Sequence, residues 1–249
     1  MNSGRCNYRI IKNQYSDQRI CNMLCAFSVF CCLLIFCTAC TPSTTAQNTS
    51  TTVLQQPSAQ LTYVALGASD TYGIGADDPL TENWPSDLST LLGGQVHLIN
   101  LGVPNIDVHN ALGVELPVAL DAHPDLVTVW LAVNDLADNV PVASYSHDLD
   151  LLLTRLRAAL PNARIAVANV PDITVLPRFK SYNIQTLRAK ILAYNNAIAD
   201  SVARHSALLV DLYHSDLAQH PEYISGDGFH PSTIGYSQVA QLFYQVLKT

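Results

Sequence analysis

Five short apolar runs, separated by longer stretches with helical periodicity, constrain the fold of this 249-residue chain more than any other feature. The runs lie at residues 61–66, 96–101, 126–133, 165–170 and 207–212. Near-continuous apolar runs of this length are typical of strands buried on both faces of a parallel sheet. We therefore expect an α/β fold, a three-layer sandwich in which a doubly wound five-stranded parallel sheet is covered by helices on both faces.

The segments between the runs repeat apolar residues at the spacing of an α-helix. One pattern extends from Tyr145 to Leu160 and is closed by Pro161, and another extends from Ile184 to Val202. A last helix is predicted to begin after Ser232, whose hydroxyl can cap its free N–H groups. Ligands of such sheets bind beyond the carboxyl ends of the strands, so we expect a site among the residues that follow them.

Residues 1–39 have the composition of a targeting segment. Four basic residues precede an apolar stretch at 23–36, and small residues stand before Cys40. This order is similar to a bacterial lipoprotein signal with Cys40 as the lipidated residue, although Cys37 stands where leucine is usual. An uncleaved membrane anchor and an ordinary secretory signal are alternatives, and Met23 is an alternative start. Each interpretation exports the rest of the chain to the cell membrane or beyond it.

Residues 40–60 are rich in Ser, Thr and Gln and carry no charge, so we expect a disordered tether there. The remaining residues, 61–249, are enough for one α/β domain with a sizeable core. All seven cysteines lie within the first 40 residues, which excludes disulfides, a cysteine nucleophile and cysteine-ligated zinc from this domain.

The charge of the exported part argues against nucleic-acid binding. Removal of residues 1–39 leaves nine basic against 19 acidic side chains, a net charge of −10 with no basic cluster. No Walker A or dinucleotide-binding motif follows a strand and no metal ligand set stands out, so we expect no cofactor and no metal. We expect a monomeric domain that reaches the membrane only through its N-terminal lipid or anchor.

A possible catalytic constellation comes from two distant segments. Asp227 and His230 stand three positions apart in Asp-Gly-Phe-His-Pro, and Ser69 follows the first apolar run. A serine hydroxyl needs an adjacent base to act as a nucleophile, and a carboxylate can hold the imidazole in the required tautomer. Each piece alone has a plainer interpretation, since serine after a strand and Asp-x-x-His before a helix are also capping and turn residues.

The order of four segments resembles the SGNH or GDSL hydrolases from residue 61 to the end. Residues 67–69, Gly-Ala-Ser, stand where that family has Gly-Asp-Ser. Residues 100–102, Asn-Leu-Gly, match its second block. Residues 132–135, Ala-Val-Asn-Asp, match its Gly-x-Asn-Asp block, and residues 227–231 match its last block. The resemblance implies the SGNH variant of the flavodoxin-like fold and an acyl-serine mechanism.

By this resemblance, Ser69, Asp227 and His230 would form the catalytic triad. The backbone N–H groups of Ser69 and Gly102 and the amide of Asn134 would form the oxyanion hole. Three positions depart from the family: Ala68 replaces its aspartate, Ala132 replaces a glycine, and Asn105 stands where a glycine is common. Asparagine can still adopt a left-handed backbone there.

We therefore expect an exported serine esterase or acyl hydrolase that acts on lipid or acetylated-glycan esters. Segments 70–83, 103–115, 134–144 and 171–183 are predicted to shape its pocket because they follow strand ends. An acyltransferase with the same site and a surface lipoprotein that binds without turnover are alternatives. A classical α/β-hydrolase fits less well, because Thr71 stands where its nucleophile motif requires glycine.

Overall fold

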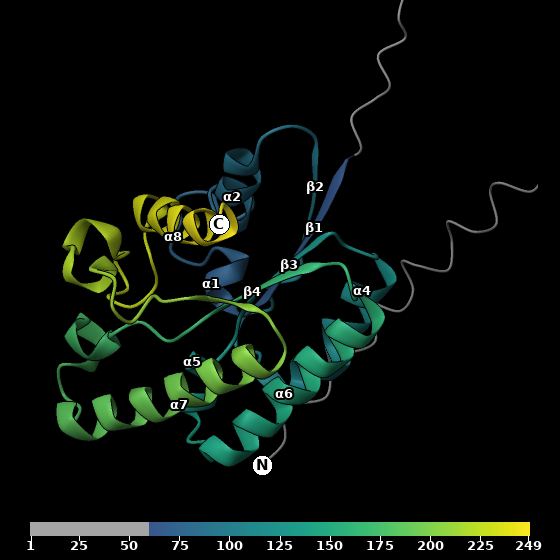
Figure 1. The fold of residues 1–249 in the computed structure, drawn as a ribbon. Helices are drawn as coiled ribbons and strands as arrows, with labels where there is room; N and C mark the ends of the chain where they lie inside the picture. The colour runs from purple at the N-terminus through teal and green to yellow at the C-terminus, as the bar shows by residue number, and fades with distance from the viewer. Residues whose placement is uncertain (1–59) are drawn as a thin grey trace, which may run out of the picture. The chain divides into compact units, whose positions relative to one another are not determined.

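The structure is a computed structural model that describes residues 60–249, and Figure 1 shows its fold. The predicted targeting segment, Cys40 and the tether up to residue 59 lie outside the described residues. The described part contains a five-stranded parallel sheet of order β2-β1-β3-β4-β5, which confirms the doubly wound prediction. The strands are β1 (Leu61–Gly67), β2 (Val96–Asn100), β3 (Leu126–Trp130), β4 (Arg164–Ala168) and β5 (Leu208–Val210).

Each predicted apolar run forms a strand, and the two runs that exceed their strands most, by three residues each, are those of β3 and β5. Central strand β3 is buried at all five positions, as its Leu-Val-Thr-Val-Trp sequence favours, and it ends at Trp130. The run continues to residue 133 because the chain stays buried where it turns into the next helix. Strand β5 has three residues and lies at the edge of the sheet, where only one neighbour supplies ladder hydrogen bonds.

The helices form two layers (Figure 1). One layer contains α2 and α8, which lie side by side, and the other contains α6 and α7. The α-helices are α1 (Ser69–Tyr72), α2 (Trp84–Leu92), α3 (Val108–Val114), α4 (Leu116–Asp121), α5 (Val133–Ala137), α6 (Val142–Ala159), α7 (Ile184–Arg204) and α8 (Thr233–Leu247). Short 3₁₀ turns are η3 (Ile173–Val175), η4 (Pro177–Phe179), η5 (Leu217–Gln219) and η6 (Pro221–Tyr223). No helix within residues 60–249 has both the length and the apolarity needed to cross a membrane.

The structure confirms the two helix boundaries that were predicted from a proline and from a capping serine. Helix α6 ends at Ala159, two residues before Pro161. Helix α8 begins after Ser232, whose hydroxyl accepts a hydrogen bond from the Gly235 N–H at 3.2 Å. The segment before α8 is therefore held at a defined helix start.

A separate apolar core fills each side of the sheet. On the α2/α8 side, the rings of Trp84 and Phe243 stack at 4.3 Å and join the two helices. On the other side, α6 and α7 bury their leucine and isoleucine faces, and Tyr145 packs on Tyr194 at 4.7 Å. Packing on both sides fixes the carboxyl ends of the strands, where the predicted site residues lie.

Candidate active site

Ser69 is the first residue of α1, directly after β1. A Cβ atom at Gly67 would lie 2.0 Å from Thr71 Oγ1 and 2.9 Å from the Trp130 carbonyl oxygen, so glycine is required where the strand turns into the helix. As the first helical residue, Ser69 has a backbone N–H with no partner inside the helix. The turn thus presents the hydroxyl and a free N–H at the same edge of the sheet.

A tight loop before α8 holds Asp227 and His230. The Ser225 N–H donates to the His230 carbonyl at 2.8 Å, and the Gly228 N–H donates to the Ser225 carbonyl at 3.0 Å. Gly228 has a φ of 71°, a left-handed conformation that glycine adopts without steric cost. The loop is closed by backbone pairing and does not depend on the substrate for its shape.

The three predicted triad residues meet in a hydrogen-bonded relay. His230 Nε2 lies 3.0 Å from Ser69 Oγ, and His230 Nδ1 lies 2.5 Å from Asp227 Oδ2. An ionised carboxylate can only accept hydrogen bonds, so Nδ1 carries the proton and Nε2 accepts from the serine hydroxyl. This is the tautomer that a general base for Ser69 requires.

The surroundings of Asp227 keep it ionised. Partial burial of Asp227 opposes its ionisation. The carboxylate accepts hydrogen bonds from the His230 ring, the Ser225 hydroxyl and the backbone N–H groups of Phe229 and His230. These bonds outweigh burial and lower the pKa of Asp227 to about 2. The carboxylate is therefore charged throughout the physiological pH range. It can both orient the imidazole and stabilise the imidazolium.

Asn134 lies at the start of α5, after β3, and lines the same cleft as Ser69 and His230. Its side-chain amide donates one hydrogen bond to the Ile106 carbonyl at 2.8 Å. An amide nitrogen carries two hydrogens, so the second one stays available to a ligand. The bond to Ile106 also orients the amide.

Gly102 is placed differently from its predicted role. Its N–H donates to Asn100 Oδ1 at 3.0 Å, so it is not free for an oxyanion. A Cβ atom at Gly102 would lie 2.4 Å from the Tyr72 nitrogen, so this glycine lets the chain pass close to α1. The prediction that Gly102 supplies an oxyanion-hole donor is corrected for this reason.

Asn105, three residues later, lines the cleft with Ser69 and Asn134. Its φ of 65° confirms the left-handed backbone expected of an asparagine at this position. Its N–H donates to no acceptor among residues 60–249. Asn105 is therefore the residue of this loop whose backbone can donate to a bound ligand.

Glu115, between α3 and α4, is a buried acid that the sequence analysis missed. Its side chain is 1% exposed, and Oε2 accepts from the Gly67 N–H at 3.1 Å. Burial raises the pKa of Glu115 to about 9 despite the N–H groups of Gly67 and Val103, so the group is protonated at neutral pH. Glu115 supports the turn beside Ala68, where the family has aspartate. Its helical spacing with Ala111 and Ala119 was the available signal that it faces the core.

The cleft around Ser69 has a volume of about 520 Å³ and is open to solvent. Residues from all four predicted segments line it, including Ile74, Asn105, Leu136 and Phe179, which confirms that loops after strand ends shape the pocket. Within the described part of the chain, no group of three or more His, Cys, Asp or Glu residues could hold a metal ion.

A serine, histidine and aspartate in relay at the carboxyl edge of a doubly wound parallel sheet define a serine hydrolase of the α/β class. The chain matches the model of the GDSL-like lipase/acylhydrolase family over residues 65–238. It belongs to this family, and it is a serine hydrolase acting on ester bonds. No curated protein matches the chain.

Solved structures with a similar fold include three named enzymes. TesA has a TM-score of 0.63 and 19% sequence identity, and the matched region covers 75% of this chain and 98% of the TesA chain. The extracellular lipase of Streptomyces rimosus has a TM-score of 0.62 and 18% identity, covering 75% and 99%. The esterase EstA of Pseudoalteromonas sp., inhibited by monoethylphosphonate, has a TM-score of 0.59 and 20% identity, covering 75% and 96%. At these identities the similarity concerns the fold.

Proposed function

We propose that this protein is an exported esterase that hydrolyses carboxylic esters through an acyl intermediate on Ser69. The relay from Ser69 through His230 to Asp227 carries the proposal. In the first half-reaction, His230 Nε2 takes the Ser69 proton as Oγ attacks the ester carbonyl carbon. The imidazolium then gives that proton to the leaving alcohol oxygen. In the second half-reaction, water attacks the acyl-serine with His230 again as base.

Three donors could hold the negative oxygen of the tetrahedral intermediate: the Ser69 N–H, the Asn105 N–H and the Asn134 amide. Preorganised donors at such an oxygen each lower the barrier by about 3 kcal/mol. Asn105 takes the oxyanion-hole role expected of Gly102 because the Asn105 N–H makes no hydrogen bond within residues 60–249 and the residue lines the cleft.

The walls of the cleft favour an ester with an apolar acyl or aryl group. Phe179, Tyr182 and Phe229 line it, and the rings of Phe179 and Phe229 meet edge to face at 5.8 Å. We propose lipid esters as the first substrate class and acetylated glycans as the second. A panel of p-nitrophenyl esters of increasing chain length, run beside sugar acetates, separates the two classes.

The triad proposal predicts that Ser69→Ala removes ester hydrolysis while leaving the fold intact, because the hydroxyl is lost and the bond it breaks, to His230 Nε2, lies in the open cleft and not in the core. Hydrolysis of p-nitrophenyl butyrate measures the effect, with circular dichroism as the folding control. Ser144→Ala is the matched control and should keep wild-type turnover, since Ser144 is an exposed serine of α6 that does not line the cleft. Ser69→Ala retaining wild-type turnover would place the nucleophile elsewhere.

The export proposal is supported by the charged flank, the apolar stretch and the small residues before Cys40. With a lipidated Cys40, the enzyme is expected in the membrane fraction of bacterial cells and should incorporate labelled palmitate. Cys40→Ser should abolish labelling and leave an unprocessed precursor. Equal labelling of both proteins would contradict lipidation at this residue.

A further inference from the structure

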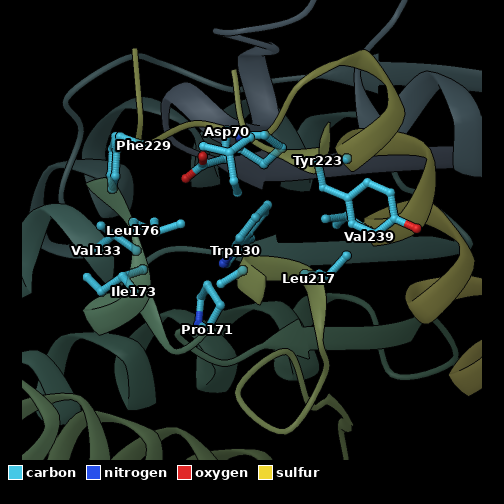
Figure 2. Close-up of a pocket in the computed structure, with 14 residues that line it drawn as sticks. Asp70, Trp130, Val133, Pro171, Ile173, Leu176, Leu217, Tyr223, Phe229 and Val239 are labelled. Atoms are coloured by element: carbon cyan, nitrogen blue, oxygen red, sulfur yellow. The ribbon is translucent and has the colours of Figure 1, made fainter. Parts of the chain in front are cut away.

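An apolar chamber adjoins the catalytic cleft (Figure 2). The chamber and the cleft share Val133, Ile173 and Phe229 as walls. The chamber is small, with a volume of about 40 Å³. Apart from the phenol of Tyr223, its only ionisable lining group is the carboxyl of Asp70, the residue after the nucleophile.

The Asp70 carboxyl has no partner on another residue. Among residues 60–249 it makes no hydrogen bond to another residue and no ion pair, and its own backbone N–H supplies its one donor. In Figure 2 its oxygens lie among the side chains of Phe229, Leu176 and Trp130. The residue is half-buried, and these apolar walls take part of the hydration of the carboxylate, which makes its ionised form costly.

The charged and titratable groups that face Asp70 come from three elements. His230 on the catalytic loop attracts its negative charge, and Asp227 on the same loop repels it. Tyr236 on α8 and Tyr223 on η6 are neutral phenols near it. Burial, with a smaller contribution from Asp227, outweighs the attraction of His230 and raises the pKa of Asp70 to about 6. Above that pH the chamber holds a negative charge beside the catalytic imidazole.

We propose that Asp70 is a positioning residue for the ester hydrolysis proposed above: its unpartnered carboxylate stabilises the imidazolium that forms when His230 Nε2 takes the Ser69 proton. Asp70 itself neither gives nor takes a proton during the reaction. The proton still passes from Ser69 Oγ to Nε2 and then to the leaving alcohol. Asp70 contributes its negative charge. While His230 is neutral no positive charge balances it, and when His230 becomes an imidazolium the two opposite charges attract.

The proposal predicts a specific change in the pH profile of Asp70→Asn, which keeps the shape and removes the charge. A neighbouring opposite charge stabilises the protonated form of a general base by an amount that corresponds to about one pH unit or more. The acid limb of kcat/KM should move down by that amount. At pH 8, kcat should fall about tenfold with KM nearly unchanged, because the imidazolium of the transition state loses its support.

Asp77→Asn is the matched control, because Asp77 is an exposed acid in the loop that follows α1 and does not line the chamber. It should leave the acid limb in place. Asp70→Leu should repeat the limb shift of Asp70→Asn, since both lose the charge. A limb that stays at the wild-type pH in both Asp70 variants would overturn the proposal, whatever happens to the overall rate.

The ¹⁵N NMR titration of His230 in the wild-type protein tests the same coupling without catalysis and without a variant. The His230 nitrogen shifts and the Asp70 carboxyl ¹³C shift should each show two inflections at shared midpoints. Independent single inflections would overturn the coupling even if the Asp70 variants failed to fold. A protein that shows the coupling but hydrolyses no ester would contradict the proposed function and leave the electrostatic pair standing.

Discussion

At the residue scale, the site uses two acids whose roles differ with their protonation, the exposed Asp227 and the buried Glu115. Asp227 accepts hydrogen bonds from four groups and stays charged. Glu115 accepts one from Gly67 in an apolar setting and stays neutral. The same chemical group therefore supplies charge to the histidine in one place and an uncharged acceptor to the nucleophile turn in the other.

Glu115 makes stability depend on pH. Its folded pKa of about 9 lies above the ordinary value of 4.5, so the native state holds a proton that the unfolded chain releases between those values. Stability should fall as pH rises through this window, by up to about 1.4 kcal/mol per unit. In Glu115→Gln, urea unfolding at pH 5 and pH 8 should show a much smaller difference than in the wild type. Parallel stability curves for the two proteins would contradict a buried neutral acid.

The loop after β2, which contains Gly102 and Asn105, shows which residue roles can be assigned from sequence and which cannot. The resemblance pointed to Gly102 because a glycine follows the strand, but the carbonyl oxygen of the Asn100 side chain occupies its N–H. That bond depends on the path of the loop past α1 and leaves no trace in the residue pattern. Asn105 was noted for its left-handed potential, and the structure shows that conformation.

At the element scale, the turn from β1 into α1 sets the position of the nucleophile. Gly67→Ala places a methyl group against Thr71 and the Trp130 carbonyl, so α1 must move. The expected result is a loss of about 1–3 kcal/mol of stability and a fall in kcat for ester hydrolysis. Gly113→Ala is the matched control, since a Cβ atom there meets nothing within 4 Å and alanine favours a helix. Equal activity and stability in the two variants would contradict this account.

The elements themselves were predictable because burial and helical periodicity act locally on sequence. Strand β3 and helix α7 carry uninterrupted patterns, and both lie where the sequence predicts them. Strand β5 is shorter than its apolar run because the sheet ends there. Strand lengths at an edge depend on neighbours that are distant in sequence, so periodicity cannot fix them.

At the scale of the whole molecule, folding brings together residues from opposite ends of the domain. Ser69 and His230 stand 161 positions apart and meet at 3.0 Å. The order of the four sequence blocks predicted this meeting, because parallel strands place their carboxyl ends at one edge. The chamber behind His230 and the unpartnered carboxyl of Asp70 could not be predicted in this way, since they arise from the packing of loops.

Mapping the site of a fluorophosphonate adduct by mass spectrometry tests the assembled relay most directly, because only a serine activated by its base displaces the fluoride efficiently. The account predicts a single adduct on the peptide that contains Ser69, and labelling at least a hundredfold slower in His230→Ala. A correctly folded protein that takes the adduct on another serine, or that is labelled equally fast without His230, would contradict it.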